Sequence, residues 1–546
     1  MKTEDLMNDV AGWRRIDDAL SVHARRTPTA VAVSFEGRHW SWAAFDALVG
    51  HTAQALVSAG LAPGDRVALL STPRPEYLLV LMALSRVGAI YVGLNPRYTV
   101  NEVAEAVGRV RPRLLITLRS FEGRDFLALI DAVAGQVALP PVVSFDSMDS
   151  CVEGLSRIGR LPPPPSDTLD VPTRSALPGT AVIVFTSGTT GRPKAAMLTH
   201  RGLLHAAAVQ HLRLNPPQPR YLCNLPVNHV GCLMNLTLAA LVGGGSVVFL
   251  QRFSAARTLQ LIRDERVNCW LQVPAMYHEC VRDPSFDPKA LGHLHSICIG
   301  GGAASAWTIR QLREIGVPLY VEYGQTETSS SAAYSDPGAD DEVLAHCVGR
   351  FDRHFEFRIA DRDGRLCAPG EVGEIQGRGA LIFAGYFGDP QATQAAFTSD
   401  GWLHTGDLAM QRPDGNVAIQ GRLKEMIKSG GYNVYPREIE QVLESHPDID
   451  QVVVVGLPDE RYGEAVHAVI AWRTRAPGRE ALAELCRSRL ANYKVPKSFR
   501  VIEAFPLLAN GKIDRVTTRA MASGLPELNA SGTPAKHHLA NQRETT

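Results

Sequence analysis

The sequence lacks an excess of charge of either sign. Its 546 residues include 56 Lys and Arg and 56 Asp and Glu, so the formal net charge is zero. No overall field therefore attracts nucleic acid or an anionic membrane, and we expect no nucleic-acid partner. A local basic site for a phosphate-bearing ligand is compatible with this balance.

Cysteine is sparse, and its spacing forms no recognisable pattern. The nine cysteines stand singly, and no two of them have Cys-x-x-Cys spacing. This distribution argues against a zinc site and against a framework of disulfide bonds. It favours reduced thiols, as in a cytoplasmic protein.

Long apolar runs and a secretory leader are also missing. The first ten residues, MKTEDLMNDV, are acidic and contain no apolar core, which is unlike a signal peptide. The longest apolar run, residues 77–84, is followed at once by Ser85 and Arg86. It is too short to span a bilayer. We therefore predict a buried helix at this place, no membrane span, and a cytoplasmic location.

What the sequence does contain is a long alternation of strand and helix patterns. The length predicts about two to four domains or subdomains. Short apolar runs are typical of strands buried on both faces, and helical patterns such as residues 199–211 lie between them. The runs are 67–70, 114–116, 181–185, 221–225, 246–250, 268–273, 296–299 and 319–323. This order predicts an α/β fold with mostly parallel sheets covered by helices.

The pattern changes near residue 355. Short strands separated by Asp-Gly and Pro-Gly pairs predict a small antiparallel β unit. After Gly421 a helix pattern at 436–446, a strand pattern at 452–457 and a helix pattern at 480–490 predict a compact α+β unit. The Pro-rich residues 161–178 are predicted to be a connector. We therefore divide the chain into a large N-terminal domain (1–421), a small C-terminal domain (422–523) and a disordered polar tail (524–546).

The most specific local signal is TSGTTGRPK at residues 186–194, directly after an apolar strand pattern. Glycines let backbone N–H groups turn toward an anion, hydroxyl groups add donors, and Lys194 adds charge. The P-loop pattern requires Gly-Lys-Ser/Thr, whereas here Lys194 follows Pro193 and precedes Ala195. The string therefore predicts a phosphate-binding loop of another kind.

This string closely resembles the phosphate loop of the adenylate-forming superfamily, which includes acyl- and aryl-CoA synthetases, peptide-synthetase adenylation domains and firefly-type luciferases. Further motifs of that family follow in order, over roughly residues 15–523: GGGAA at 300–304, YGQTE at 323–327, GWLHTGD at 401–407, GRLK at 421–424, SGGYNVYP at 429–436 and NGK at 510–512. The resemblance implies a mobile C-terminal domain and a two-step reaction. A carboxylic acid and ATP give an acyl-adenylate, and a thiol, with CoA favoured, then takes the acyl group.

The resemblance also implies an ATP site. Tyr323 would stack on the purine, Asp407 and Arg422 would hold the ribose hydroxyls, and Glu327 would hold Mg²⁺, a hard cation suited to carboxylate and phosphate oxygens. The implied catalytic residues are Thr186, Lys194, His229, Glu327 and Lys512. The implied ATP-binding residues are Thr186, Ser187, Gly188, Thr189, Thr190, Gly191, Lys194, Gly302, Ala303, Ala304, Tyr323, Gly324, Gln325, Thr326, Asp407, Arg422 and Lys512.

Carried over in the same way, the acyl pocket is made of His229, Gly231, Cys232, Met234, Gly302, Ser329, Ser330 and Ala332. Amino-acid-activating relatives have an Asp after the first pocket strand, but residues 227–232 contain no acid, which argues against an α-amino acid. Because the implied lining is small and uncharged, we predict a bulky or long hydrophobic carboxylate.

The thiol side of the site follows from the resemblance as well. Gly430 and Gly431 would line the pantetheine tunnel, Arg97 would meet a CoA phosphate, and Lys424 would be the hinge between two domain arrangements. Three alternatives stay open: transfer to a carrier-protein phosphopantetheine, transfer of the acyl-adenylate to a separate transferase, and a catalytically inactive nucleotide-binding regulator. A homodimer also stays open.

Overall fold

The computed structural model describes residues 3–162, 179–186, 193–473, 478–508 and 512–529. Most of the expected connector therefore lies outside the described residues. So do six residues of the phosphate loop, namely Ser187, Gly188, Thr189, Thr190, Gly191 and Arg192.

The N-terminal domain contains a nine-stranded sheet with the order β17-β16-β15-β14-β13-β11-β12-β1-β2. In this order, the strands β15, β14, β13, β11, β12 and β1 run parallel to one another. The edge strands β16, β17 and β2 run antiparallel to their neighbours. The strands are β1 (Val31–Phe35), β2 (Arg38–Ser41), β11 (Arg220–Cys223), β12 (Ser246–Phe249), β13 (Cys269–Gln272), β14 (Ser296–Ile299), β15 (Leu319–Gln325), β16 (Ser330–Tyr334) and β17 (Arg350–Phe351). Carboxyl ends of the parallel strands, where ligands collect in α/β folds, thus meet along one edge.

A six-stranded sheet with the order β10-β9-β4-β3-β5-β8 completes this layer structure. Only β10 runs antiparallel to its neighbour. The strands are β3 (Arg66–Leu70), β4 (Ile90–Leu94), β5 (Leu114–Leu118), β8 (Val142–Phe145), β9 (Thr180–Thr186) and β10 (Lys194–Thr199). Strands β3, β4 and β5 are buried at every position, as their continuous apolar runs predict.

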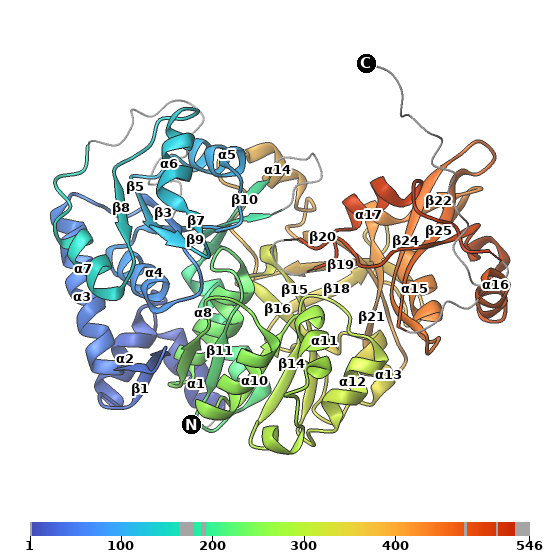
Figure 1. Cartoon of the computed structure of the whole chain (residues 1–546), viewed down its shortest axis with the longest axis horizontal. Helices are drawn as coiled ribbons and strands as arrows, with labels where there is room; N and C mark the ends of the chain where they lie inside the picture. Colours follow the sequence, from blue (N-terminus) through green and yellow to red (C-terminus); the bar gives the residue numbers. More distant parts are fainter. Residues whose placement is uncertain (1–2, 163–178, 187–192, 474–477, 509–511, 530–546) are drawn as a thin grey trace.

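Helices cover both sheets (Figure 1). The expected buried helix is α4 (Pro75–Val87), in which residues 75–85 are all buried. The other helices of this domain are α1 (Thr3–Ala11), α2 (Asp18–Arg26), α3 (Trp42–Ser58), α5 (Val100–Val110), α6 (Phe126–Ala134), α7 (Met148–Ser156), α8 (His200–Leu214), α9 (Ala239–Val242), α10 (Ala255–Asp264), α11 (Pro274–Arg282), α12 (Ala306–Arg313), α13 (Asp341–His346) and α14 (Pro390–Ala395). Within the described residues, no helix is both long and apolar enough to cross a membrane.

The predicted antiparallel unit is a four-stranded sheet. Its strands are β18 (Glu356–Ala360), β19 (Val372–Arg378), β20 (Leu403–Gln411) and β21 (Val417–Arg422). The glycines of its predicted turns, Gly364, Gly370 and Gly415, all have positive φ, which explains the Asp-Gly and Pro-Gly pairs.

The C-terminal α+β unit lies at one end of the long axis of the molecule (Figure 1, orange to red). Its elements are β22 (Ile427–Ser429), β23 (Tyr432–Val434), α15 (Pro436–Glu444), β24 (Ile449–Asp459), β25 (Gly463–Trp472), α16 (Arg479–Arg487), β26 (Ser498–Val501) and α17 (Arg515–Ala522). It has a core of its own, which includes Ile439, Leu443, Ile470 and Phe499.

The tail begins later than the sequence predicted. Leu528 is buried in the C-terminal core, and its N–H donates to the carbonyl of Phe499. The expectation of disorder from residue 524 is therefore wrong for residues 524–529. One apolar side chain and backbone pairing with β26 hold a segment whose composition is otherwise polar.

Candidate active site

Two antiparallel strands carry the ends of the predicted phosphate loop. Lys194, the first residue of β10, pairs in register with Thr186, the last residue of β9. The Thr186 hydroxyl donates to the Lys194 carbonyl at 3.4 Å. From α5, Arg109 donates to the Pro193 carbonyl at 2.6 Å. The described ends of this loop, Thr186 on one side and Pro193 and Lys194 on the other, are thus held in place.

One tyrosine that the sequence analysis missed joins two of the predicted residues. The Tyr386 hydroxyl donates to the Glu327 carboxylate at 2.8 Å, and the Lys194 ammonium lies 4.7 Å from the centre of the Tyr386 ring. Burial and the Glu327 charge raise the pKa of Tyr386, so its hydroxyl stays a donor. An isolated β-bridge to Ala196 of β10 positions Tyr386 at the site. This contact joins residues far apart in the sequence, so no local sequence pattern predicts it.

The predicted ribose-binding pair is formed across two strands of the four-stranded sheet. Asp407 on β20 faces Arg422 on β21, and the Arg422 Nε lies 3.0 Å from Asp407 Oδ1. The Tyr323 hydroxyl donates to Asp407 Oδ2 at 2.7 Å. Asp407 lies within β20 and is only 5% exposed. The turn in this glycine-rich motif lies at Gly401. The later residues of the motif form a strand because they pair with β19 and β21.

The chain after Tyr323 follows an unusual path. A Cβ on Gly324 would lie 1.8 Å from the Ser330 carbonyl oxygen, so the close approach of β15 and β16 requires glycine there. Gln325 and Thr326 lead into a short 3₁₀ helix, η4 (Thr326–Thr328), which contains Glu327.

Ser329 and Ser330 follow η4 with φ of 52° and 110°. Both values lie in the region that non-glycine residues rarely adopt, and such conformations cluster at functional sites. The Thr328 hydroxyl donates to the Ser330 carbonyl at 2.6 Å, which helps to hold this path.

The glycine-rich loop of residues 300–304 lies between β14 and α12. Gly302 and Ala303 are exposed, whereas Ala304 is buried. A Cβ on Gly301 would lie 3.2 Å from Lys512 Cε and 3.7 Å from Lys512 Nζ. The structure thus brings the C-terminal Lys512 against the loop predicted to bind adenine.

Lys512 lies close to several of the predicted site residues. Burial against the N-terminal domain lowers the pKa of Lys512. The Arg422 charge lowers that pKa further, and Asp407 opposes the shift. Lys512 is also close enough to His229 to lower the pKa of that histidine. Its neighbours Asn510 and Gly511 lie outside the described residues.

His229 stands before an unexpected helical element. Residues Gly231–Leu238 form a π-helix, η2, a rare geometry that often marks functional sites. The Gly231 N–H donates to His229 Nδ1 at 3.2 Å, which assigns the proton of the neutral ring to Nε2. Burial, followed by the Lys512 charge, lowers the pKa of His229 to about 4.

Not all residues of the predicted acyl pocket are brought together. Met234 and Ala332 have no exposed surface. Cys232 is also fully buried, and its sulfur lies 3.4 Å from that of Cys223 on β11. Ser330, in contrast, bonds to Asn235 of η2.

Through Asn235 the structure reveals a residue that the sequence analysis missed. Asn235 Nδ2 lies 3.0 Å from Glu322 Oε1, so a buried acid lies beside the predicted pocket. None of the predicted lining residues is charged, so the expectation of an uncharged lining stays a prediction. A signal was present, since an acid within an apolar strand pattern is exceptional.

The predicted thiol-side residues are all exposed. Gly430 and Gly431 form the exposed tip between β22 and β23, and both have positive φ. Apart from its chain neighbours, nothing within 4 Å would meet a Cβ on Gly431. Arg97 is exposed in a loop that a hydrogen bond from Asn228 Nδ2 to Tyr98 (3.3 Å) ties to the His229 segment. Lys424 is exposed in a 3₁₀ turn, η5 (Leu423–Glu425), directly after β21.

The residues present fit a magnesium ion that ATP helps to hold. Among the described residues, no group of three or more His, Cys, Asp or Glu side chains could bind a metal ion by itself. Glu327 remains partly exposed, with a carboxylate fixed by Tyr386. Magnesium commonly takes one or two protein carboxylates together with substrate phosphates, which matches a single Glu327.

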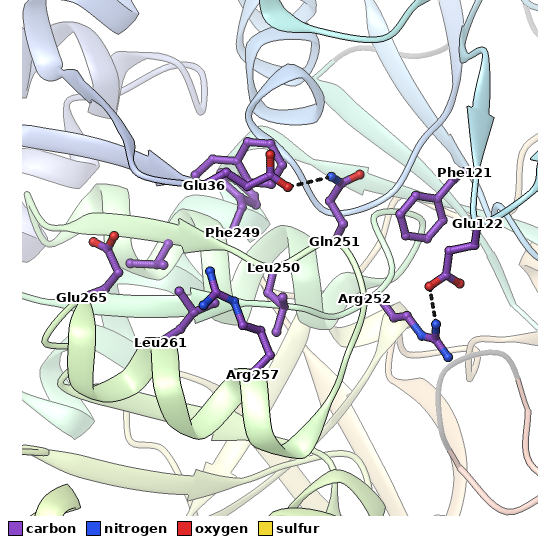
Figure 2. A pocket seen from close by; sticks show the side chains of 12 residues that line it. Glu36, Phe121, Glu122, Phe249, Leu250, Gln251, Arg252, Arg257, Leu261 and Glu265 are labelled. Carbon is purple, nitrogen blue, oxygen red and sulfur yellow. Dashed lines mark hydrogen bonds and ion pairs between the residues drawn. The ribbon is translucent and has the colours of Figure 1, made fainter.

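A pocket of about 240 Å³ lies elsewhere, between β1, β12, α10 and the β6–β7 hairpin (Ser120–Phe121 and Arg124–Asp125). Figure 2 shows its mixed charges, with Arg252 paired to Glu122 and Gln251 bonded to Glu36. None of the predicted site residues lines it.

Comparison with known proteins agrees with this arrangement. The family model described as AMP-binding enzyme matches residues 20–387, and the model of the C-terminal domain of AMP-binding enzymes matches residues 438–512. An indoleacetate–CoA ligase of Aromatoleum aromaticum is 36% identical over 511 residues, 92% of this chain and 97% of that protein. A feruloyl-CoA synthase of Amycolatopsis is 34% identical, covering 90% and 95%.

Among solved structures, ATP-bound MatB from Rhodopseudomonas palustris superposes with a TM-score of 0.80 at 26% identity, covering 92% of this chain and 98% of that one. Both domains and their order agree with these matches. The chain therefore belongs to the AMP-binding enzyme family, the adenylate-forming enzymes, and within it is close to the acyl-CoA synthetases.

Proposed function

We propose that this protein is an AMP-forming acid–CoA ligase that activates a bulky carboxylic acid, with aromatic acids as the first choice. The observation that carries the proposal is the position of Lys512. This lysine comes from the C-terminal domain and lies against Gly301, within electrostatic reach of His229, Arg422 and Asp407. A cation at that point stands between the proposed acid and nucleotide sites.

In the first step, a carboxylate oxygen of the acid attacks the α-phosphorus of ATP, and the bond to the bridging oxygen of pyrophosphate breaks. Lys512 and Lys194 stabilise the charge that develops on the phosphates, and Asp407 with Arg422 fixes the ribose. Bound Mg²⁺, held by Glu327, would neutralise further phosphate charge. The protein mainly positions groups and provides fixed charges, as in other phosphoryl and nucleotidyl transfers.

In the second step, the sulfur of CoA attacks the carbonyl carbon of the acyl-adenylate, and AMP leaves. Gly430 and Gly431 form an exposed hairpin tip in the arrangement described above, and a rotation about Lys424 would bring them to this site. Such a rotation would also withdraw Lys512, as expected where one domain serves two half-reactions.

The nature of the acid is supported by the relatives, whose names give indoleacetate and ferulate as substrates. Residues 227–232 offer no carboxylate for an α-ammonium group, which disfavours amino acids.

ATP–pyrophosphate exchange with a panel of acids tests this proposal. We expect arylacetates, cinnamates or long-chain acids to give the highest kcat/KM, and CoA alone, without carrier protein, to release AMP. A preference for acetate or an α-amino acid would overturn the proposed substrate class. Exchange without any CoA-dependent AMP release would assign the acyl group to a carrier protein or a separate transferase. Failure to exchange with every acid would favour the inactive regulator.

A further inference from the structure

The two middle strands of the four-stranded sheet, β19 and β20, pair irregularly next to Asp407. Strand β19 has a single residue between the positions that pair with His404 and Leu408, whereas β20 has three residues there, 405–407. Strand β20 therefore contains a bulge, and Asp407 is the last residue of that bulge. Bulges are frequent next to active sites, where they re-aim a side chain.

The carboxylate of Glu374 on β19 holds this bulge. Glu374 Oε1 accepts the Gly406 N–H at 2.9 Å, and Glu374 Oε2 lies 2.7 Å from His404 Nδ1. Both oxygens therefore bind β20, on either side of Thr405. Gly406 has a φ of 71°, which lies outside the strand region, so a side chain accepts its N–H in place of the strand ladder. The Glu374 side chain is only 14% exposed, so little water competes for these bonds.

A hydroxyl group holds the other part of the bulge. Thr405 Oγ1 donates to the Ile375 carbonyl at 2.6 Å and accepts the Asp407 N–H at 3.1 Å. The backbone N–H groups of residues 406 and 407 are thus both bound by side chains, one from each strand. Together these contacts fix the backbone that carries the Asp407 side chain.

The direction of the Asp407 side chain depends on this backbone. The Tyr323 hydroxyl lies 2.7 Å from Asp407 Oδ2, and Arg422 Nε lies 3.0 Å from Asp407 Oδ1. A shift of register by one residue turns a side chain to the other face of a sheet. The bulge must therefore be kept for the Asp407 carboxylate to meet these partners.

We propose that Glu374 is a positioning residue for the ribose of ATP. Glu374 itself would not touch the nucleotide: it holds the Gly406 peptide, and through that peptide the Asp407 carboxylate that would accept the ribose hydroxyls. A carboxylate has about four acceptor positions, so Asp407 can bind these hydroxyls in addition to its protein partners. This inference rests on the proposed function, since it concerns the nucleotide of that same reaction.

Binding of AMP and of 2′,3′-dideoxy-AMP, which lacks both ribose hydroxyls, tests this proposal. Calorimetry gives the Kd of each nucleotide for the wild type, Glu374→Ala and Glu374→Gln. We expect the wild type to bind AMP roughly tenfold to a hundredfold more tightly than the dideoxy nucleotide, because the analogue cannot make the charge-assisted hydrogen bonds to Asp407.

In Glu374→Ala the Kd for AMP should rise by about tenfold, whereas the Kd for dideoxy-AMP should stay within about twofold. A purely structural role would weaken both nucleotides alike. Glu374→Gln keeps an oxygen for the Gly406 N–H and should retain most of the preference for AMP. Glu371→Ala is the matched control, because Glu371 also accepts a backbone N–H, from Ala368 at 2.9 Å, but does so in the turn before β19. It should leave both Kd values unchanged.

Equal Kd values of the two nucleotides in the wild type, or an equal loss of both in Glu374→Ala, would overturn the proposal. If Glu374→Ala does not fold, Thr405→Val replaces it, since it removes the other contacts that hold the bulge. Thr405→Val should weaken AMP alone, and an equal weakening of both nucleotides would count against the bulge. If the wild type binds neither nucleotide, the proposed function itself fails. A wild-type preference for AMP that Glu374→Ala leaves intact rejects the role of Glu374 alone.

Discussion

Three histidines, His200, His211 and His229, are held neutral by the packing around them. Burial lowers the pKa of each to about 4, whereas an unfolded histidine titrates near 6.5. Between these values the unfolded chain binds more protons than the folded one, so stability falls as the pH falls from about 6.5 toward 4.

We predict that the urea midpoint decreases steadily from pH 7 to pH 5, and that His200→Gln makes the decrease less steep. An equal slope in His200→Gln and wild type would contradict neutral burial of His200.

Tyr386 acts on two charged groups at once, and its two contacts can be separated. Tyr386→Phe keeps the ring beside Lys194 and removes only the hydroxyl that fixes Glu327. We expect adenylation to slow by roughly tenfold, the value of one charge-assisted hydrogen bond, with a raised Mg²⁺ requirement. Tyr386→Leu, which also removes the cation–π contact, should slow it further. Equal activity of Tyr386→Phe and wild type would show that the hydroxyl has no role.

At the scale of single elements, the turn of the β22–β23 hairpin can by itself explain why residues 430 and 431 are glycines, without any role in a thiol tunnel. A two-residue loop with positive φ at both positions favours glycine, and asparagine is the next best residue. Gly431→Leu would therefore strain the turn even without a tunnel, whereas Gly431→Asn adds a side chain with little strain.

If the glycines line the thiol path, both Gly431 variants should lose thioester formation and keep adenylation. If they only serve the turn, Gly431→Asn should form thioester at a near-normal rate. Half-reaction assays with synthetic acyl-adenylate and CoA measure the difference.

Elements with continuous apolar runs were predictable, since β14 and β3 lie within a residue of the expected bounds. The π-helix η2 was not, because GCLMNLTL has the apolar character of an ordinary buried helix. The family motifs located Lys194, Glu327 and Lys512. Asn235, Glu322 and Tyr386 escaped prediction because their roles arise only from contacts between residues far apart in the sequence.

At the scale of the whole molecule, polar side chains join the C-terminal domain to the N-terminal one. Arg473 lies 5.2 Å from the Trp307 ring centre and 3.3 Å from Asp450, and His278 Nε2 lies 3.5 Å from Asp450. These side chains are partly buried, and the rotation that we propose would break their contacts. We predict that Arg473→Ala slows adenylation by a few fold and leaves thioester formation unchanged. A loss in both half-reactions would make the interface a general stabiliser of the fold.

The central claim is that the described arrangement serves adenylation, and that Lys512 is needed only there. A Lys charge about 4 Å from a developing phosphate charge contributes up to ~4 kcal/mol at an effective dielectric near 20, and each ~1.4 kcal/mol is tenfold in rate. Lys512→Ala should therefore slow acyl-adenylate formation by roughly a thousandfold, yet convert synthetic acyl-adenylate and CoA to thioester at a near-normal rate. Equal loss in both half-reactions, measured separately on the same preparation, would contradict the account.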